Sequence, residues 1–193
     1  MEKRNIKNLR IIRLLLGSKD TPLTKYRIAK LAECSYPWAL EFLRSLESKK
    51  IIEGTKVIDI DRLVGQYIKA MPKVKYVDFF YKNPEDILKK TKLKYALTTY
   101  AAENFYTKQL FLSRYDLYIG EKDYALWKKN ILANGLIGKG NIRLLLTYDD
   151  KILDEAIEQK GMSIVALPQL LVDLKREGGV CMESYNLLVH KNV

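Results

Sequence analysis

The chain has 193 residues, of which 48% are hydrophobic, enough to fill the core of one large domain or of two small ones. Lys and Arg number 34 against 23 Asp and Glu, and the formal charge of +11 makes a polyanion the first partner to consider. No window approaches the roughly 18 continuous apolar residues of a membrane span, and the N-terminus lacks the apolar block of a signal peptide, so we expect a cytoplasmic protein that does not contact a membrane.

The positive charge is concentrated in the first part of the chain. Residues 1–71 hold 15 Lys and Arg against 8 Asp and Glu, a net charge of +7, whereas residues 72–193 hold 19 against 15, a net charge of +4. The shorter segment therefore favours binding to a polyanion. The alternative is that the surplus of lysine serves solubility alone.

The first helix is predicted from its apolar spacing. Between Ile6 and Leu16 apolar residues recur at steps of three and four, which is the spacing of a helix with one buried face. Gly17 and Ser18 end this helix. The residues that we expect to face the core are Ile6, Leu9, Ile12, Leu15 and Leu16.

Two further helices flank a break at Glu33-Cys34-Ser35. Thr24 is expected to cap the short second helix. Ser35 is expected to cap the third helix, and Pro37 suits its first turn because the proline nitrogen has no hydrogen to leave unsatisfied. The inward residues are predicted to be Ile28, Leu31 and Ala32 in the second helix, and Ala39, Phe42, Leu43 and Leu46 in the third.

A β-hairpin and a fourth helix follow. Two short β segments, Ile51–Glu53 and Lys56–Ile58, flank a turn at Gly54-Thr55. The fourth helix runs from about Ile60 to Met71 and ends before Pro72. The chain then changes to an alternating, strand-like pattern, so we place a domain boundary near residues 70–73.

The order of helix, helix, tight turn, helix and hairpin resembles winged helix-turn-helix regulators. The run IAKLAECSYPWALEFLRSLESKKII carries this resemblance, which covers about residues 5–60. In such a fold the helix after the turn enters the major groove of DNA, which is about 12 Å wide, and presents its N-terminal side chains to the base edges.

The predicted DNA-binding side chains lie on the outer face of the third helix and after it. Arg44 is expected to reach guanine or a phosphate, and Glu41 to accept a hydrogen bond from a cytosine amine. Ser35 and Tyr36 are expected to hold phosphates. The complete predicted set is Ser35, Tyr36, Glu41, Arg44, Ser45, Ser48, Lys49 and Lys56, with Lys50 as a further phosphate contact.

Two residues of the third helix fit DNA reading less well. Trp38 and Leu40 stand where polar base-reading side chains often lie. Trp38 either contacts thymine methyl groups or packs in the core or against the second domain. For the helical pair as a whole, the alternative is a packed helical hairpin that does not touch DNA.

Strands and helices alternate through residues 72–193, which predicts a layered α/β domain. The predicted strands are Val74–Tyr81, Tyr115–Ile119, Ile142–Thr147 and the run MSIVAL. The predicted helices are Pro84–Lys90, Thr98–Thr107, Tyr124–Asn134, Lys151–Lys160, the run PQLLVDLKREGG and Met182–His190.

Residue types suited to catalysis are sparse. The sole histidine, His190, lies near the chain end, and no glycine-rich phosphate loop is present. Asp149-Asp150 is a candidate metal-binding pair or a helix cap. Another candidate, Asp116 with Glu121 and Lys122, resembles nuclease sites, but the lysine directly follows the glutamate and would lie on the opposite face of an extended chain. Cys34 and Cys181 form no disulfide framework or zinc motif, and we interpret both as buried thiols. We expect the protein to have no enzymatic activity and to bind no cofactor or metal.

Four runs resemble the C-terminal domain of AbiEi-like antitoxins, the regulators of type IV toxin–antitoxin systems. They are KYALTTYAAENFY, RYDLYIG, NIRLLLTYDD and IVALPQLLVDLKREGGVCMESYNLL, over about residues 94–190. The resemblance implies an N-terminal winged helix that represses its own operon and a nucleotidyltransferase-like toxin as partner. It also implies a structural role for the motif residues Leu167, Pro168, Gln169, Leu170, Asp173 and Leu174. The double glycine Gly178-Gly179 is expected to end the motif helix.

The sequence thus predicts an α/β protein, α+β overall, with a winged helix-turn-helix domain at residues 1–71 and an AbiEi-like α/β domain at residues 72–193. The predicted function is a sequence-specific DNA-binding transcriptional regulator, an autorepressing antitoxin that binds double-stranded DNA. A symmetric operator would imply a homodimer, whereas direct repeats also suit monomers. The alternatives are an adaptor that binds a toxin-like protein and a nucleotide-processing enzyme targeted by a winged helix.

Overall fold

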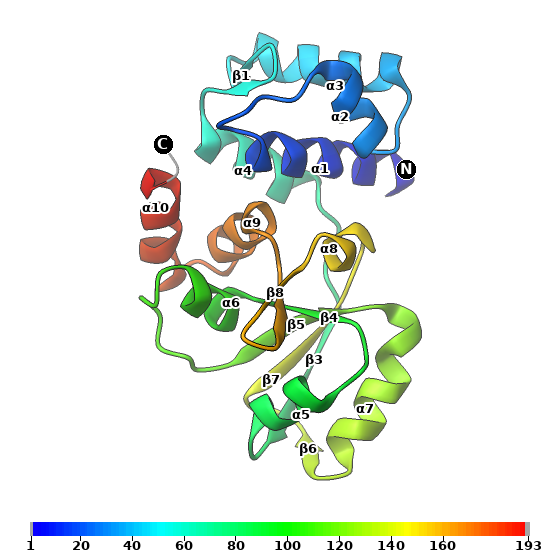
Figure 1. Cartoon of the computed structure of the whole chain (residues 1–193), viewed down its shortest axis with the longest axis vertical. Helices are drawn as coiled ribbons and strands as arrows, with labels where there is room; N and C mark the ends of the chain where they lie inside the picture. Colours follow the sequence, from blue (N-terminus) through cyan, green and yellow to red (C-terminus); the bar gives the residue numbers. More distant parts are fainter. Residues whose placement is uncertain (1, 192–193) are drawn as a thin grey trace. The chain divides into compact units, whose positions relative to one another are not determined.

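The computed structural model describes the backbone of residues 2–191 and the side chains of residues 5–190. The chain is a mixed α/β protein whose contacts divide it into two compact units (Figure 1). The first unit ends at Pro72, and the second is Lys73–His190. No helix within the described residues is long and apolar enough to span a membrane.

The first unit holds four helices and one hairpin among its described residues. Thr24 caps α2 as predicted, because its hydroxyl oxygen accepts a hydrogen bond from the amide of Arg27 at 3.2 Å. Asp59 caps α4 in the same way at the amide of Arg62. The elements are α1 (Glu2–Gly17), α2 (Lys25–Leu31), α3 (Tyr36–Ser48), β1 (Ile52–Glu53), β2 (Lys56–Val57) and α4 (Ile60–Ala70).

The core of the first unit is formed by one apolar stripe from each helix. The stripes consist of Leu9, Ile12 and Leu15 in α1, Ile28 and Ala29 in α2, Ala39, Leu43 and Leu46 in α3, and Leu63 and Val64 in α4. Ile6, Leu16 and Phe42 are only half-buried. The prediction for Leu31 was wrong: it is 44% exposed, because positions 28, 29 and 32 define the inner face of α2 and position 31 lies beside it.

One buried polar contact in this core was not predicted. Arg13 is buried in α1, and its guanidinium donates a hydrogen bond to the hydroxyl of Tyr67 in α4 at 2.9 Å. A buried guanidinium needs such partners, since desolvating the charge is otherwise costly. The contact links the first and last helices of the unit.

The second unit contains a seven-stranded mixed sheet among its described residues, with the order β6-β3-β7-β5-β4-β9-β8. Its parallel pairs are β5 with β7 and β4 with β9, and the other neighbours are antiparallel. The strands are β3 (Tyr76–Tyr81), β4 (Tyr95–Thr98), β5 (Tyr115–Ile119), β6 (Gly135–Ile137), β7 (Ile142–Leu146), β8 (Ile157–Gln159) and β9 (Met162–Ile164).

Helices pack against both faces of this sheet. On one face Tyr95 of β4 contacts the ring of Trp127 in α7 at a centroid distance of 5.7 Å, and its hydroxyl donates to the carbonyl of Leu88 in α5. On the other face Thr98 of the same strand contacts α9. The helices are α5 (Pro84–Lys90), α6 (Thr99–Tyr106), the 3-10 helix η1 (Glu121–Asp123), α7 (Tyr124–Leu132), α8 (Lys151–Asp154), α9 (Leu167–Glu177) and α10 (Cys181–Lys191).

Several predictions for the second unit were wrong. The predicted helix Thr98–Thr107 begins one residue later, and Tyr95–Thr98 forms the unpredicted interior strand β4. All four of its residues are buried, so it shows no alternation that would mark it as a strand. The predicted helix Lys151–Lys160 stops at Asp154, because the following residues pair as β8 with β9 across a turn. In that turn Lys160 and Gly161 both have positive φ.

Strand β6 was also not predicted, and two glycines allow it to form. A Cβ atom added at Gly135 would lie 2.5 Å from the carbonyl oxygen of Phe80, and one at Gly140 would lie 2.2 Å from that of Phe79. Only glycine permits such close backbone approach to β3. The double glycine at Gly178-Gly179 has positive φ at both positions and ends α9 as predicted.

Candidate nucleic-acid interface

The turn between α2 and α3 is tight and fixed by backbone contacts. Glu33 has a φ of 55°, and the amide of Cys34 donates to the carbonyl of Ala29 at 3.0 Å. The Glu33 carboxylate forms an ion pair with Arg10 of α1 at 2.6 Å. These contacts set the direction in which α3 leaves the turn, and Cys34 is half-buried rather than buried.

The start of α3 presents polar groups to solvent. Ser35 occupies the N-cap position as predicted, but its hydroxyl makes no capping hydrogen bond. Tyr36 is exposed, and its ring lies 6.4 Å from that of Tyr26, which is 69% exposed on α2. An exposed aromatic pair beside an uncapped helix N-terminus offers hydroxyl and amide donors to an anion.

The outer face of α3 carries most of the predicted side chains. Glu41, Arg44 and Ser48 are exposed, and so are Lys49 and Lys56 beyond the helix. Ser45 differs from the prediction: it is half-buried, and its hydroxyl donates to the carbonyl of Phe42 at 2.8 Å. The Ser48 hydroxyl likewise donates to the carbonyl of Ser45.

The four exposed basic side chains within α2, α3 and the β1–β2 hairpin make no hydrogen bond or ion pair with any described residue. Arg27 and Lys30 project from α2, Arg44 from α3 and Lys56 from the β1–β2 hairpin, and all four are exposed. Cations without an internal partner keep their full charge for a ligand. Helices α2 and α3 and the hairpin therefore each present at least one exposed cation that has no partner among the described residues.

The β1–β2 hairpin is anchored to α3. The amide of Gly54 at its turn donates to a carboxylate oxygen of Glu47 at 2.8 Å. The guanidinium of Arg62 donates to the carbonyl of Lys49, whose own ammonium contacts Gln66. The hairpin is thus held at a defined position beside the end of α3.

Trp38 has a packing role inside the first unit. Its indole nitrogen donates to the side-chain oxygen of Asn8 in α1 at 2.9 Å, and the residue is half-buried. This contact ties α3 to α1. Leu40 is half-buried as well. Leu40 stands one turn before Arg44 on the same side of α3, whereas Trp38 is turned toward α1.

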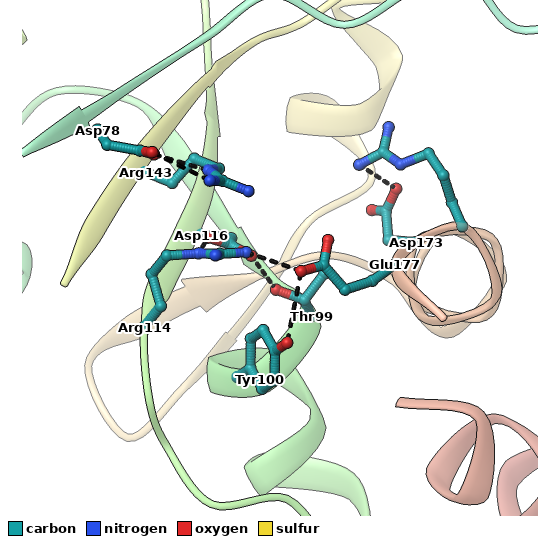
Figure 2. A network of polar contacts seen from close by, with 9 residues as sticks. Asp78, Thr99, Tyr100, Arg114, Asp116, Arg143, Asp173 and Glu177 are labelled. Atoms are coloured by element: carbon teal, nitrogen blue, oxygen red, sulfur yellow. Dashed lines mark hydrogen bonds and ion pairs between the residues drawn. The ribbon is translucent and has the colours of Figure 1, made fainter. Parts of the chain in front are cut away.

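A polar ladder crosses the sheet of the second unit (Figure 2). Thr98, Asp116, Arg143 and Asp78 are direct partners across β4, β5, β7 and β3. Arg143 forms an ion pair with Asp78 at 2.7 Å, and its guanidinium lies over the ring of Tyr76. All of these side chains stand on the same face of the sheet, because paired residues share a face.

Arg114 and Asp116 form the centre of this ladder. Arg114 forms an ion pair with Asp116 and a second one, at 3.0 Å, with Glu177 at the end of α9. The hydroxyl of Thr99, a residue with a φ of 45°, also donates to the Asp116 carboxylate. Asp116 is therefore occupied by internal partners.

Asp173 is the second centre, and it is fully buried in α9. Its carboxylate accepts hydrogen bonds from the hydroxyls of Thr98 and Tyr118 at 2.7 and 2.8 Å, and it forms an ion pair with Arg176 at 3.4 Å. Gln169, one turn earlier, donates to it as well. Burial raises the pKa of Asp173, because desolvation outweighs these partners. The motif LPQLLVDL thus fixes α9 to β4 and β5.

Of the carboxylates considered for metal chemistry, Glu121, Asp149 and Asp150 line one pocket together with Lys122, whereas Asp116 does not. The side chain of Asp149 is buried and accepts from the amide of Lys151 at 3.2 Å, as a helix cap would, whereas Asp150 is exposed. Glu121 and Lys122 lie on η1, apart from the ladder that engages Asp116. No three His, Cys, Asp or Glu side chains among the described residues form a metal-binding group.

The remaining candidates for chemistry are separate from one another. His190 is exposed in α10. Cys181 is buried in the same helix, and burial raises the pKa of its thiol to about 11.

Comparison of the chain with models of protein families, with curated proteins and with solved structures found no match.

Proposed function

We propose that the first unit is a winged helix-turn-helix DNA-binding domain and that the protein is a sequence-specific transcriptional regulator. The observation that carries this proposal is the exposed outer face of α3, where Arg44 has no hydrogen bond or ion pair with any residue that the structure describes. The net charge of +7 over residues 1–71 supports it, because phosphate neutralisation dominates affinity for DNA.

In this proposal α3 lies in the major groove and the β1–β2 hairpin follows the backbone. Arg44 and Glu41 read base edges, and Ser35 and Tyr36 hold a phosphate near the N-terminus of α3. Lys49 and Lys56 contact phosphates. Ser45 has no part, since its hydroxyl is bonded to its own helix. Arg27 and Lys30 of α2 extend the phosphate contacts.

Autorepression and antitoxin function rest on the resemblance of residues 94–190 to AbiEi-like antitoxins. Repression then occurs by occlusion of a promoter, and the second unit contributes contacts to a second copy or to a nucleotidyltransferase-like toxin. We assign no catalytic role to Asp116 or Asp173, because both are engaged by internal partners.

An exposed apolar surface in the second unit supports an adaptor as a second candidate function. It consists of Tyr76 and Phe80 on β3 and Leu136 on the edge strand β6, which share one face of the sheet, while Ile137 is exposed on the other face of the same edge. Leu136 is 68% exposed. Such patches mark protein interaction sites in many proteins, so this edge is where we place the contact with a toxin-like partner.

Lys56→Ala tests the phosphate contact of the hairpin. We expect it to weaken binding to the chain's own upstream DNA and to an unrelated duplex by the same factor. The slope of log K against log salt should become about 0.9 less steep, the value for one phosphate. Fluorescence anisotropy titrations at several salt concentrations measure both effects. An unchanged slope would remove Lys56 from the interface.

A further inference from the structure

A cavity of about 280 Å³ lies in the second unit, on the face of the sheet that α5 covers. Helices α5 and α6, strands β4 and β5 and the β8–β9 hairpin all contribute to it. Its walls are mostly apolar, formed by the side chains of Leu97, Ala101, Phe105, Leu112 and Met162. The cavity belongs neither to the proposed DNA interface nor to the polar ladder, which occupies the opposite face.

The volume limits the size of an occupant. A water-sized group takes about 30 Å³, so the cavity holds roughly nine such groups, and its volume lies just below the usual range for ligand pockets, about 300–1,000 Å³. An eight-carbon chain with a polar head has this size. Apolar walls of this kind bind the body of such a molecule by removing it from water.

The charged side chains at the cavity determine which polar head group a ligand can carry. Glu85 forms an ion pair with Lys89 at 2.6 Å and accepts a hydrogen bond from the hydroxyl of Tyr115 at 3.1 Å. These partners lower the pKa of Glu85, so its carboxylate stays ionised and is already compensated. Glu85 and Lys89 therefore compensate each other's charge at the cavity.

Lys160 is the remaining charge at the cavity. It stands in the turn between β8 and β9 with a φ of 51°, it is exposed, and it has no hydrogen bond or ion pair with any described residue. The cavity therefore combines apolar walls with one uncompensated positive charge at its rim. A neutral or cationic molecule of the same size would leave that charge without a partner.

We propose that this cavity binds a small monocarboxylate with an apolar body, whose carboxylate pairs with Lys160. The proposal is independent of DNA binding, because all the residues that carry it belong to the second unit. Helix α6 also connects the cavity to the polar ladder: Ala101 and Phe105 line the cavity, and Thr99 at the start of the same helix donates to Asp116.

Isothermal titration calorimetry of the full chain with octanoate tests the proposal. We expect saturable binding of one octanoate per chain, and much weaker binding of octylamine and acetate, which lack the negative charge and the apolar body respectively. The variant Lys160→Asn removes the charge and keeps a residue that tolerates positive φ. It should weaken octanoate binding about fivefold, the effect of one exposed ion pair.

Two matched variants complete the test. Lys160→Arg keeps the charge and should bind as the wild type does. Lys90→Asn removes an exposed lysine of α5 that does not line the cavity and should also leave binding unchanged. Thermal unfolding of each variant verifies that it is folded. Octanoate binding that fails to saturate, equal binding by Lys160→Asn, or equal binding of octylamine or acetate would overturn the proposal.

Discussion

Asp173→Ala is expected to lower the free energy of unfolding by about 3–5 kcal/mol, the cost of removing one partner from a buried ionic network. The substitution leaves the hydroxyls of Thr98 and Tyr118 and the guanidinium of Arg176 without their shared acceptor. Urea unfolding followed by circular dichroism measures the loss. Glu158→Ala, at an exposed position of β8, is the control and should change stability by about 0.5 kcal/mol or less.

The stability of Asp173→Asn, measured against pH and compared with the wild type, shows whether burial or hydrogen bonding dominates the pKa of Asp173. Because burial raises the pKa of Asp173 in the folded state, the folded protein binds this proton more tightly than the unfolded chain does. Wild-type stability is therefore lost as pH rises from the ordinary value, near 3.9, through the folded pKa. The asparagine variant lacks this loss, so its stability should improve relative to the wild type over that range. A relative decline with rising pH would show that the hydrogen bonds and Arg176 outweigh desolvation.

Arg44→Ala is expected to have the largest effect on DNA recognition. If Arg44 reads a base, its loss costs about 1–3 kcal/mol on the chain's own operator and relaxes the preference at one base position. Binding titrations on the operator and on single-base variants measure both effects. The Lys56→Ala variant is the comparison, because a phosphate contact should weaken all sequences alike. An equal loss on every duplex for Arg44→Ala would remove Arg44 from base reading.

Arg44→Lys provides a matched control for charge. Lysine keeps the positive charge but lacks the planar fork that binds two acceptors of guanine. We expect this variant to keep most of the affinity for unrelated DNA while losing preference for the operator. If it retained the full preference, Arg44 would act as a point charge and not as a base-reading side chain.

The elements of the first unit could be predicted because their signals are local. Thr24 caps α2 through the amide three residues later, and the inner stripe of α3 follows the helical period. The hydrogen bond from the Ser45 hydroxyl to its own helix could also be predicted locally, because serine inside a helix often donates to a carbonyl of the preceding turn. Leu31 was misplaced because a seven-residue helix gives too few positions to fix its inner face.

The second unit was less predictable because its strands are short and are stabilised by distant partners. Strand β4 is buried on both faces, and β8 becomes a strand only by pairing with β9. The ladder joins Asp116 to Arg143 and Thr98 to Asp173, residues that lie far apart in the sequence. The resemblance implied a structural role for Asp173, and the sequence could not indicate which strands supply its partners.

The central claim is that the first unit reads a DNA sequence. The most direct measurement is a salt titration of the purified chain on its own upstream DNA and on an unrelated duplex of equal length. We predict a preference of roughly 10³ or more for the upstream DNA, together with a steep fall in affinity as salt rises. Equal and weak binding to both duplexes would contradict the claim and leave the first unit as a protein-docking module.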